Sequence, residues 1–284
     1  LWGAASASYQ IEGAYLEDGK GENIWDAYCQ ESGHVAHGEN GNVACDHYHR
    51  FREDVKMMQK MGIKNYRFSI SWTRILPDGT GAVNQKGIQF YSDLVDALLE
   101  AGITPMVTLF HWDYPYALHQ KGGWLNPESS DWFVDYAKVV VDALSDRVTY
   151  WMTINEPQVF IGCGYAIGKF APFQKLPVRD LAQMCHNVLL AHGKTVKMIR
   201  ECAKKTPKIG FAFSTPCTTP TDNSPLAIEI ARQKSFAFTR ERFTFETAWW
   251  ADPIFLGDYP QDAYSILKSD MPNIKEGDME LISQ

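Results

Sequence analysis

The sequence has no stretch of 18 apolar residues and no run of lysines and arginines. A membrane-spanning helix needs such an apolar stretch, and nucleic-acid binding needs clustered positive charge. The 27 basic residues are outnumbered by 34 acidic ones, which gives a net charge of −7. We therefore expect neither a membrane span nor a nucleic-acid partner.

Cysteine is scarce, with six in 284 residues, and no two form a CxxC pair. This usage favours free thiols in a reducing compartment over a disulfide framework, so we expect a cytoplasmic location. The sequence opens on Leu1 with no charged-then-apolar leader. A targeting peptide is therefore either absent or removed ahead of this sequence.

Motifs for several other chemistries are missing. The sequence has no GxSxG elbow and no phosphate-binding P-loop. Asp46, His47 and His49 lie close together, but they lack the HExxH or His-plus-Cys spacing of a metal site. We expect no metal and no other cofactor.

What the sequence does contain is an alternation of short apolar strands with amphipathic helices. Apolar residues recur at helical spacing within 51–61, 88–99, 133–144 and 181–199. This order predicts a parallel sheet with right-handed crossovers. The five expected strands are Leu1–Ser6, Lys64–Trp72, Ile103–Phe110, Val148–Asn155 and Lys208–Ser214.

Polar residues at the strand ends indicate which parallel sheet this is. His111 and Trp112 follow the third expected strand, and Asn155 and Glu156 end the fourth. A (β/α)8 TIM barrel builds its site from such ends, whereas a doubly wound sheet favours a glycine-rich first turn, which residues 6–13 lack. We predict one α/β domain over residues 1–284, a TIM barrel of which this chain supplies about strands 1–5.

Glu156 is the leading candidate for chemistry. Pro157 disfavours the right-handed helical region for the residue before it, so we expect Glu156 to stay extended at the barrel mouth. Trp151 and Phe160 are close in sequence, and desolvation by such rings would favour the protonated carboxyl that a general acid needs. A solvated glutamate at a strand end is the alternative, and these residues alone do not decide between the two.

Other polar side chains are expected near the same mouth. Gln10, His111 and Trp112 could clamp hydroxyl groups with directional bonds and a ring face. Asn155 can both donate and accept, but adjacent strand residues point to opposite faces, so the strand must break at Asn155 if Glu156 serves the same site. The alternatives are a structural histidine at 111 and a turn residue at 155.

Arg67 is a cation within the second expected strand. If its side chain faces inward, it needs a carboxylate partner, because an isolated buried charge is costly. A purely structural ion pair is the alternative.

Together these segments resemble glycoside hydrolase family 1, the β-glucosidase family, from Leu1 to Gln284. The resemblance rests on several motifs in the expected order. They are 1–13 (LWGAASASYQIEG), 18–21 (DGKG), 25–26 (WD), 44–48 (ACDHY), 66–75 (YRFSISWTRI), 110–113 (FHWD), 122–124 (GGW), 153–157 (TINEP), 252–253 (DP) and 257–260 (GDYP).

The resemblance implies a role for each matching residue. Glu156 would be the catalytic acid/base, and its presence favours O-glycosides, since relatives that cleave thioglucosides carry glutamine there. Arg67 would neighbour the nucleophile, and Trp112 would line the sugar pocket. The residues implied to hold the sugar's hydroxyls are Gln10, His111 and Asn155, the last at the 2-hydroxyl.

One family feature has no match. The nucleophile of this family is the glutamate of an Ile/Val-Thr-Glu-Asn-Gly segment, and the sequence has none. Retaining chemistry needs two carboxylates about 5–5.5 Å apart. We therefore expect the molecule to continue past Gln284 with three more strands. We also expect residues 1–284 alone to be inactive and prone to associate through open strand edges.

The predicted function is a retaining β-glycosidase that removes terminal β-linked sugars from small glycosides or oligosaccharides by double displacement. A non-catalytic sugar-binding homologue is the alternative, and the presence of Glu156 counts against it. A TIM-barrel aldolase or metal enzyme would need a Schiff-base lysine or a ligand cluster at a strand end. The preferred sugar, the aglycone and the oligomeric state are left open.

Overall fold

The structure is a computed structural model that describes residues 1–31, 33–215 and 217–283. The chain divides into two compact units. The first holds Leu1–Asn155 and Thr195–Ala212, and the second holds the described residues of Glu156–Lys194 and Phe213–Gln284. Helix α9 (Val178–Cys202) contributes to both. That residues 1–284 form one domain stays a prediction.

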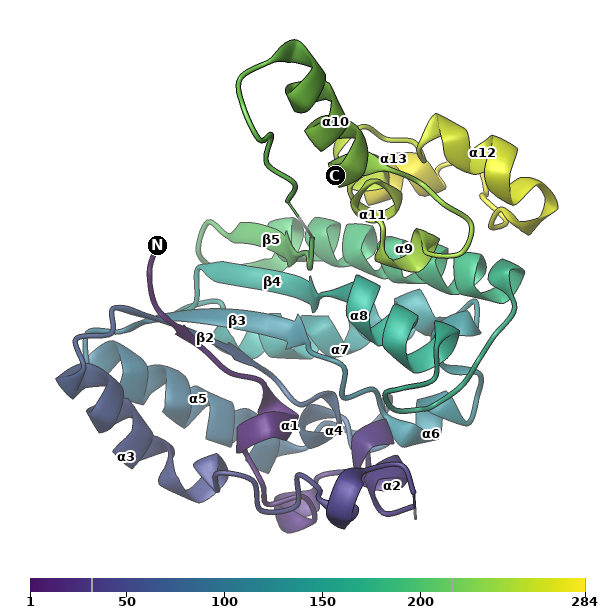
Figure 1. Ribbon diagram of the computed structural model, residues 1–284. Coiled ribbons are helices and arrows are strands. Elements are labelled where there is room, and N and C mark those ends of the chain that lie inside the picture. Colours follow the sequence, from purple (N-terminus) through teal and green to yellow (C-terminus); the bar gives the residue numbers. More distant parts are fainter. Residues whose placement is uncertain (32, 216, 284) are drawn as a thin grey trace. The chain divides into compact units, whose positions relative to one another are not determined.

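The first unit is built on a parallel sheet whose strands lie side by side in chain order (Figure 1). All five strands expected from the sequence are present among the described residues. They are β1 (Ala4–Ala5), β2 (Asn65–Ser69), β3 (Thr104–Phe110), β4 (Tyr150–Asn155) and β5 (Lys208–Ala212). Because every pair is parallel, the residues that follow these strands gather at one edge of the sheet.

The second strand ends earlier than the sequence predicts. Trp72 was expected inside it but instead begins the short helix α4 (Trp72–Ile75). The N–H of Ser71 donates to the Tyr91 hydroxyl at 2.7 Å rather than to a neighbouring strand. The indole of Trp72 is fully buried and stacks on Tyr136 with centroids 4.8 Å apart, so core packing takes it out of the sheet.

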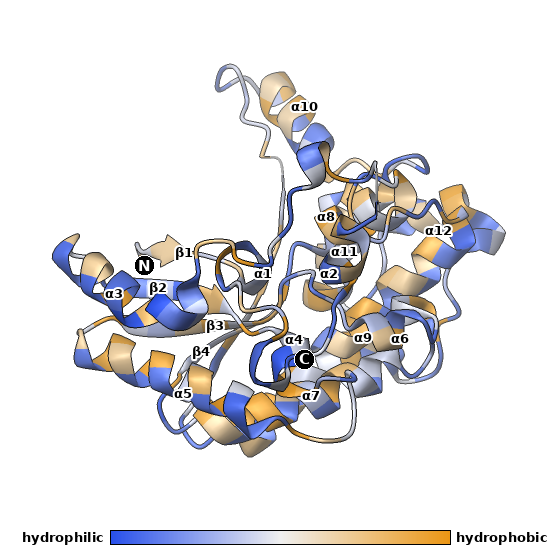
Figure 2. Ribbon diagram, turned by 90° about the horizontal axis from the view of Figure 1, so that it is seen from below, coloured by the Kyte–Doolittle hydropathy of each residue, from blue (hydrophilic) through white to orange (hydrophobic). Residues whose placement is uncertain are grey.

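Three long helices of the first unit cover one face of the sheet (Figure 1). They are α3 (His47–Lys60), α5 (Gln85–Glu100) and α7 (Ser129–Leu144). Each falls on a predicted amphipathic segment, and hydrophilic and hydrophobic residues are both seen along α3 and α5 (Figure 2). The predicted stripe of α3 is confirmed at Phe51, Val55 and Met58, which are buried, but Met61 lies past the helix end and is exposed.

Short helices fill the connections that follow the strands, and the sequence pattern did not reveal them. In α2 the Asn23 side chain accepts from the Asp26 N–H at 2.9 Å, and the Asp26 carboxylate accepts from the Asn23 N–H at 3.1 Å, which is a capping box. The short helices of the first unit are α1 (Ser8–Ile11), η1 (Glu17–Gly19), α2 (Ile24–Cys29), η2 (Ala36–Gly38), α4, α6 (Tyr116–His119) and η3 (Gly123–Leu125).

The second unit is helical. His186 of α9 lies with its Nδ1 2.9 Å from the Tyr259 hydroxyl and with its Nε2 3.0 Å from Asp278. These contacts connect α9 to the segment after α11 (Thr247–Phe255) and to α13 (Asp278–Ile282). The remaining elements of this unit are α8 (Pro157–Ile161), η4 (Gly162–Ala166), α10 (Pro225–Phe236), η5 (Phe243–Phe245), α11 (Thr247–Phe255), α12 (Gln261–Leu267), η6 (Lys268–Asp270) and α13 (Asp278–Ile282).

All six cysteines are free thiols, as the sequence predicts, and Cys29 and Cys185 are buried. Within the described residues, no helix combines the length and the apolar character that crossing a membrane would require.

Candidate active site

The ends of β3 and β4 are joined directly. Trp112 follows β3 in a left-handed backbone conformation with φ of 80°. Its indole Nε1 donates to the backbone oxygen of Asn155 at 2.8 Å. A bulky residue rarely adopts positive φ, because its Cβ crowds the backbone. The turn is therefore held in place by the contact to β4.

Asn155 ends β4 at an irregularity in the strand. Met152 pairs with Gly210 but Asn155 pairs with Ala212, so β4 carries one residue more than β5 over this stretch. Such a bulge interrupts the alternation of side chains between the two faces. The sequence analysis predicted that the strand must break at Asn155 if Asn155 and Glu156 serve one site. The bulge is such a break.

The Asn155 amide is buried and fixed by two neighbours. Its Oδ1 accepts from Arg67 Nη2, and its Nδ2 donates to His111 Nε2 at 3.1 Å. A guanidinium can only donate, so Arg67 determines which end of the amide carries the oxygen. Side chains from β2, from the end of β4 and from the residue after β3 thereby form one hydrogen-bonded set.

Arg67 reaches this set from β2. Besides Asn155, its Nε donates to the Thr108 hydroxyl at 2.8 Å. The sequence predicts a carboxylate partner for an inward-facing arginine, and that pairing stays a prediction beside these two bonds. Arg67 is half-buried, so water still solvates part of its charge.

His111 is a neutral imidazole. It accepts the Asn155 amide at Nε2, which places its proton on Nδ1. Burial, and then the positive charge of Arg67, lower the pKa of His111 to about 3. Its Nδ1 is buried and has no hydrogen-bond partner among the described residues. The Nδ1–H of His111 is therefore available to donate a hydrogen bond to a ligand.

Two further predicted site residues, Gln10 and Glu156, also lie in segments that follow strands. Gln10 lies in α1, which follows β1, and it is exposed. Glu156 comes directly after Asn155 and caps α8, where its backbone oxygen accepts from the Val159 N–H at 2.9 Å.

The prediction that Glu156 stays extended is wrong. Its backbone is left-handed, with φ 44° and ψ 65°. Pro157 does exclude the right-handed helical region, as expected. However, Pro157 is also the first residue of α8, and the chain must turn sharply from strand to helix. Left-handed glutamates are uncommon, and strained residues of this kind cluster at functional sites.

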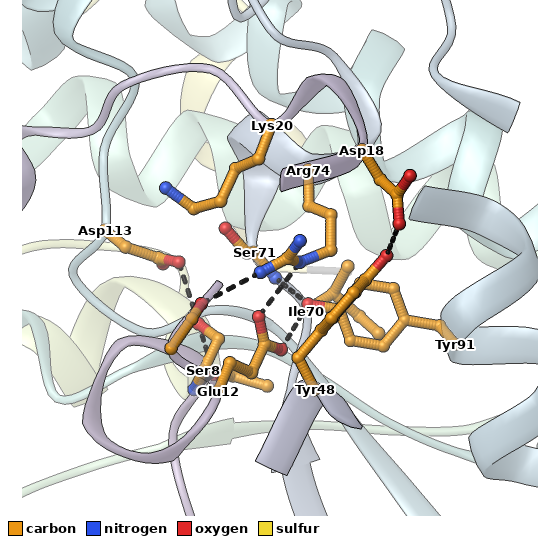
Figure 3. Close-up of polar contacts among 12 residues, drawn as sticks. Ser8, Glu12, Asp18, Lys20, Tyr48, Ile70, Ser71, Arg74, Tyr91 and Asp113 are labelled. Atoms are coloured by element: carbon orange, nitrogen blue, oxygen red, sulfur yellow. Dashed lines mark hydrogen bonds and ion pairs between the residues drawn. The ribbon is translucent and has the colours of Figure 1, made fainter. Parts of the chain in front are cut away.

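Sequence reasoning missed a buried polar network formed mainly by residues of the segments that follow β1, β2 and β3 (Figure 3). Arg74 Nε pairs with Glu12 Oε2 at 3.1 Å, and Tyr91 donates to the other Glu12 oxygen at 2.5 Å. Ser8 donates to Asp113 Oδ2 at 2.8 Å. Four of these residues, Ser8, Glu12, Arg74 and Asp113, lie inside the quoted motifs, so the sequence already marked them. The sequence did not reveal which of them pair, because the partners are far apart in sequence.

The histidines near the start of α3 are engaged with carboxylates. His49 lies 2.6 Å from Asp46 and 2.9 Å from Glu17, and His47 lies 2.6 Å from Asp54. In the part of the chain that the structure describes, no group of three or more histidine, cysteine or acidic side chains is arranged to hold a metal ion.

A parallel α/β sheet with a guanidinium, an amide, an imidazole and an indole gathered at its carboxyl edge is the arrangement of a (β/α)8 barrel enzyme. The model of glycosyl hydrolase family 1 matches residues 1–284, and the chain belongs to this family. The resemblance seen in the sequence is thereby confirmed.

Individual relatives agree. Beta-glucosidase A of Acetivibrio thermocellus is 45% identical over all of this chain and 62% of that protein. The coniferin beta-glucosidase of Pinus contorta is 42% identical over 96% of this chain and 55% of that protein. The chain spans less than two thirds of the length of these relatives.

Solved structures confirm the fold class. The family 1 β-glucosidase from Thermotoga maritima superposes with a TM-score of 0.89 at 42% identity, covering 100% of this chain and 62% of that one. The structure of the same enzyme in complex with deoxynojirimycin superposes with a TM-score of 0.89 at 43% identity, with the same coverage. The fold class is the TIM barrel, and the residues that the structure describes form five parallel strands of it.

Proposed function

We propose that this protein is a retaining β-glycosidase of the β-glucosidase type, which releases terminal β-linked sugars from small O-glycosides or oligosaccharides. One observation carries the proposal. His111 is held neutral with an unpartnered, buried Nδ1–H in a polar set at the strand ends of a family 1 barrel. A sugar hydroxyl is a natural acceptor for that donor, and the related Thermotoga maritima enzyme is solved with deoxynojirimycin and with glucoimidazole.

The other members of the set have capacity left for a sugar. Asn155 uses one N–H toward His111 and one oxygen lone pair toward Arg67, which leaves one N–H and one lone pair. We assign these to the 2-hydroxyl. Gln10 is assigned to further hydroxyls, and Trp112 lines the sugar pocket. Arg67 orders Asn155 and is assigned a place beside the nucleophile.

Glu156 is assigned the acid/base role. In the first step its protonated carboxyl gives a proton to the leaving oxygen while a nucleophilic carboxylate attacks the anomeric carbon. In the second step the ionised Glu156 takes a proton from the water that releases the sugar, so both displacements leave the configuration unchanged. No residue of this sequence is assigned as the nucleophile. That residues 1–284 alone are inactive stays a prediction, which an assay of that polypeptide checks.

We also propose a cytoplasmic location and no nucleic-acid partner. The free state of all six cysteines and the negative net charge support this.

Following the first-formed product of an aryl β-glucoside by NMR tests the proposed function in the full-length protein. The β-anomer should form first and then equilibrate with the α-anomer. An initial α-anomer would overturn the retaining mechanism. Binding of deoxynojirimycin without any hydrolysis would support the non-catalytic sugar-binding alternative instead.

A further inference from the structure

Asp113 is a buried carboxyl that joins two of the segments assigned to sugar binding (Figure 3). Its Oδ2 accepts from the Ser8 hydroxyl at 2.8 Å, and neither side chain reaches solvent. The backbone N–H of Ser8 donates to Ser69 Oγ at 2.7 Å, and the Ser69 hydroxyl returns a bond to Ser8 Oγ at 3.2 Å. The start of α1, the end of β2 and the turn after β3 thus share one buried set of hydroxyls and a carboxyl.

We propose that Asp113 is a positioning residue, which holds the turn of His111 and Trp112 against helix α1 and its Gln10 through the hydrogen bond to Ser8. This inference rests on the proposed function, because it concerns the same sugar site. Asp113 directly follows Trp112, and Ser8 is the first residue of the short helix that carries Gln10. Fixing Asp113 to Ser8 therefore fixes the two segments relative to each other.

The turn needs such an anchor because it is strained. Trp112 has φ of 80°, a conformation that is strained in a non-glycine residue and persists only when its surroundings enforce it. On one side Trp112 is held by its bond to the Asn155 backbone. On the other side the next residue, Asp113, is held by Ser8. Loss of either contact would allow the turn to relax and displace His111.

The surroundings of Asp113 suit a neutral acid. Its Oδ1 is buried with no hydrogen-bond partner among the described residues, so the Ser8 hydroxyl is the one side-chain donor that would stabilise an ionised Asp113 there. The adjacent Glu12 receives both the Arg74 guanidinium and the Tyr91 hydroxyl. Burial, opposed by the Ser8 bond, raises the pKa of Asp113 to about 7.

Charged and titratable groups on the neighbouring elements act on Asp113 in opposite directions. The negative charge of Glu12, on the α1 side, raises the pKa of Asp113, and the ammonium of Lys20, after η1, lowers it. Tyr136 of α7 faces the same region as a neutral phenol, because burial raises its own pKa well above the usual value.

The test compares Asp113→Asn with Asp113→Ala in the full-length protein. Asparagine keeps an oxygen for Ser8 and is always neutral, so kcat/KM for an aryl β-glucoside at pH 6 should stay within about threefold. Alanine removes the acceptor, so kcat/KM should fall at least tenfold and the Kd for deoxynojirimycin should rise. Ser145→Ala is the control. It deletes a buried hydroxyl that accepts from the Lys204 N–H at 3.1 Å, away from the site, and should leave kcat/KM unchanged.

A second measurement does not depend on catalysis. A folded-state pKa above the unfolded value means that stability is full at low pH and is lost as pH rises toward about 7. Relative to Asp113→Asn, the folded-to-unfolded ratio of the wild type should fall up to tenfold per pH unit between about 4 and 7. Urea unfolding at several pH values measures this.

The outcomes separate the two proposals. If Asp113→Ala keeps its kcat/KM, or if Asp113→Asn loses as much as Asp113→Ala, Asp113 does not position the site. If no variant and no wild type hydrolyses the substrate, the proposed function fails. The Kd of each variant for deoxynojirimycin then still decides whether Asp113 positions the site.

Discussion

The Asn155 amide and the His111 imidazole are in direct contact, with Nδ2 donating to Nε2 at 3.1 Å. Arg67 sets the direction of this bond, because it occupies the amide oxygen. The contact fixes the His111 tautomer and directs its remaining N–H away from Asn155. An asparagine on β4 thus determines which hydrogen bonds a histidine after β3 can make.

His111 should therefore not titrate in the physiological range. Its pKa is lowered to about 3 by burial and by the charge of Arg67. Arg67→Met removes the second cause, so the pKa of His111 should rise but stay below its ordinary value. Imidazole ¹⁵N chemical shifts between pH 3 and 8 measure this. A wild-type His111 that titrates near pH 6.5 would contradict the assignment.

The low pKa of His111 also predicts how stability depends on pH. A depressed folded-state pKa means that stability is present above the unfolded value of about 6.5 and is lost as pH falls toward about 3. His111→Gln should remove this part of the acid destabilisation. Urea unfolding at pH 4, 5 and 7 compares the two proteins, and parallel curves would show that His111 makes no such contribution.

Glu156→Gln should slow the hydrolysis of substrates with poor leaving groups by roughly 10²–10⁴, the usual contribution of a positioned general acid. Substrates with very good leaving groups should lose less in the first step, because they leave without a proton. A leaving-group series measures the difference, and Glu100→Gln is the exposed control. Equal losses along the series would mean that Glu156 is not the acid.

Asn155→Ala should reduce kcat/KM by about a hundredfold or more while ground-state binding weakens less. Hydrogen bonds to the 2-hydroxyl strengthen in the oxocarbenium-like transition state and supply several kcal/mol. The mutation should matter much less for a 2-deoxy glycoside. If both substrates suffer the same loss, Asn155 does not act on the 2-hydroxyl.

Glu12→Gln should destabilise the fold by about 3–5 kcal/mol, because it leaves the buried Arg74 guanidinium without its carboxylate. The side chains of Arg74 and Glu12 are only 1% and 6% exposed. The matched control is Glu53→Gln, which breaks the exposed pair with Arg50 and should change stability little. Urea denaturation compares them, and similar midpoints for both variants would contradict the argument.

The fold was largely readable from the sequence because its signals are local. Strand β3 is a short run rich in apolar residues, and α7 repeats Phe133, Tyr136, Val140 and Leu144 at helical spacing on a fully buried face. Trp72 was misplaced because its alternation continues that of β2. Tertiary contacts, such as the stacking on Tyr136 from a distant helix, take it out of the sheet.

The candidate site was readable in part. His111 and Trp112 follow β3 and Asn155 ends β4, so parallel topology alone predicts that they meet. The backbone of Glu156 was not predictable from Pro157, because proline excludes one region without selecting between the others. The bond between Ser8 and Asp113 joins residues 105 positions apart, and no periodic pattern encodes such a pairing.

The left-handed backbones of Trp112 and Glu156 set fold stability and catalysis in opposition. Glycine would adopt either conformation without strain, so a library selected only for heat resistance should accumulate glycine at these two positions. Such variants would fold well and lose the proposed glycosidase activity. Directed evolution of this protein toward higher working temperatures therefore has to screen turnover and stability together.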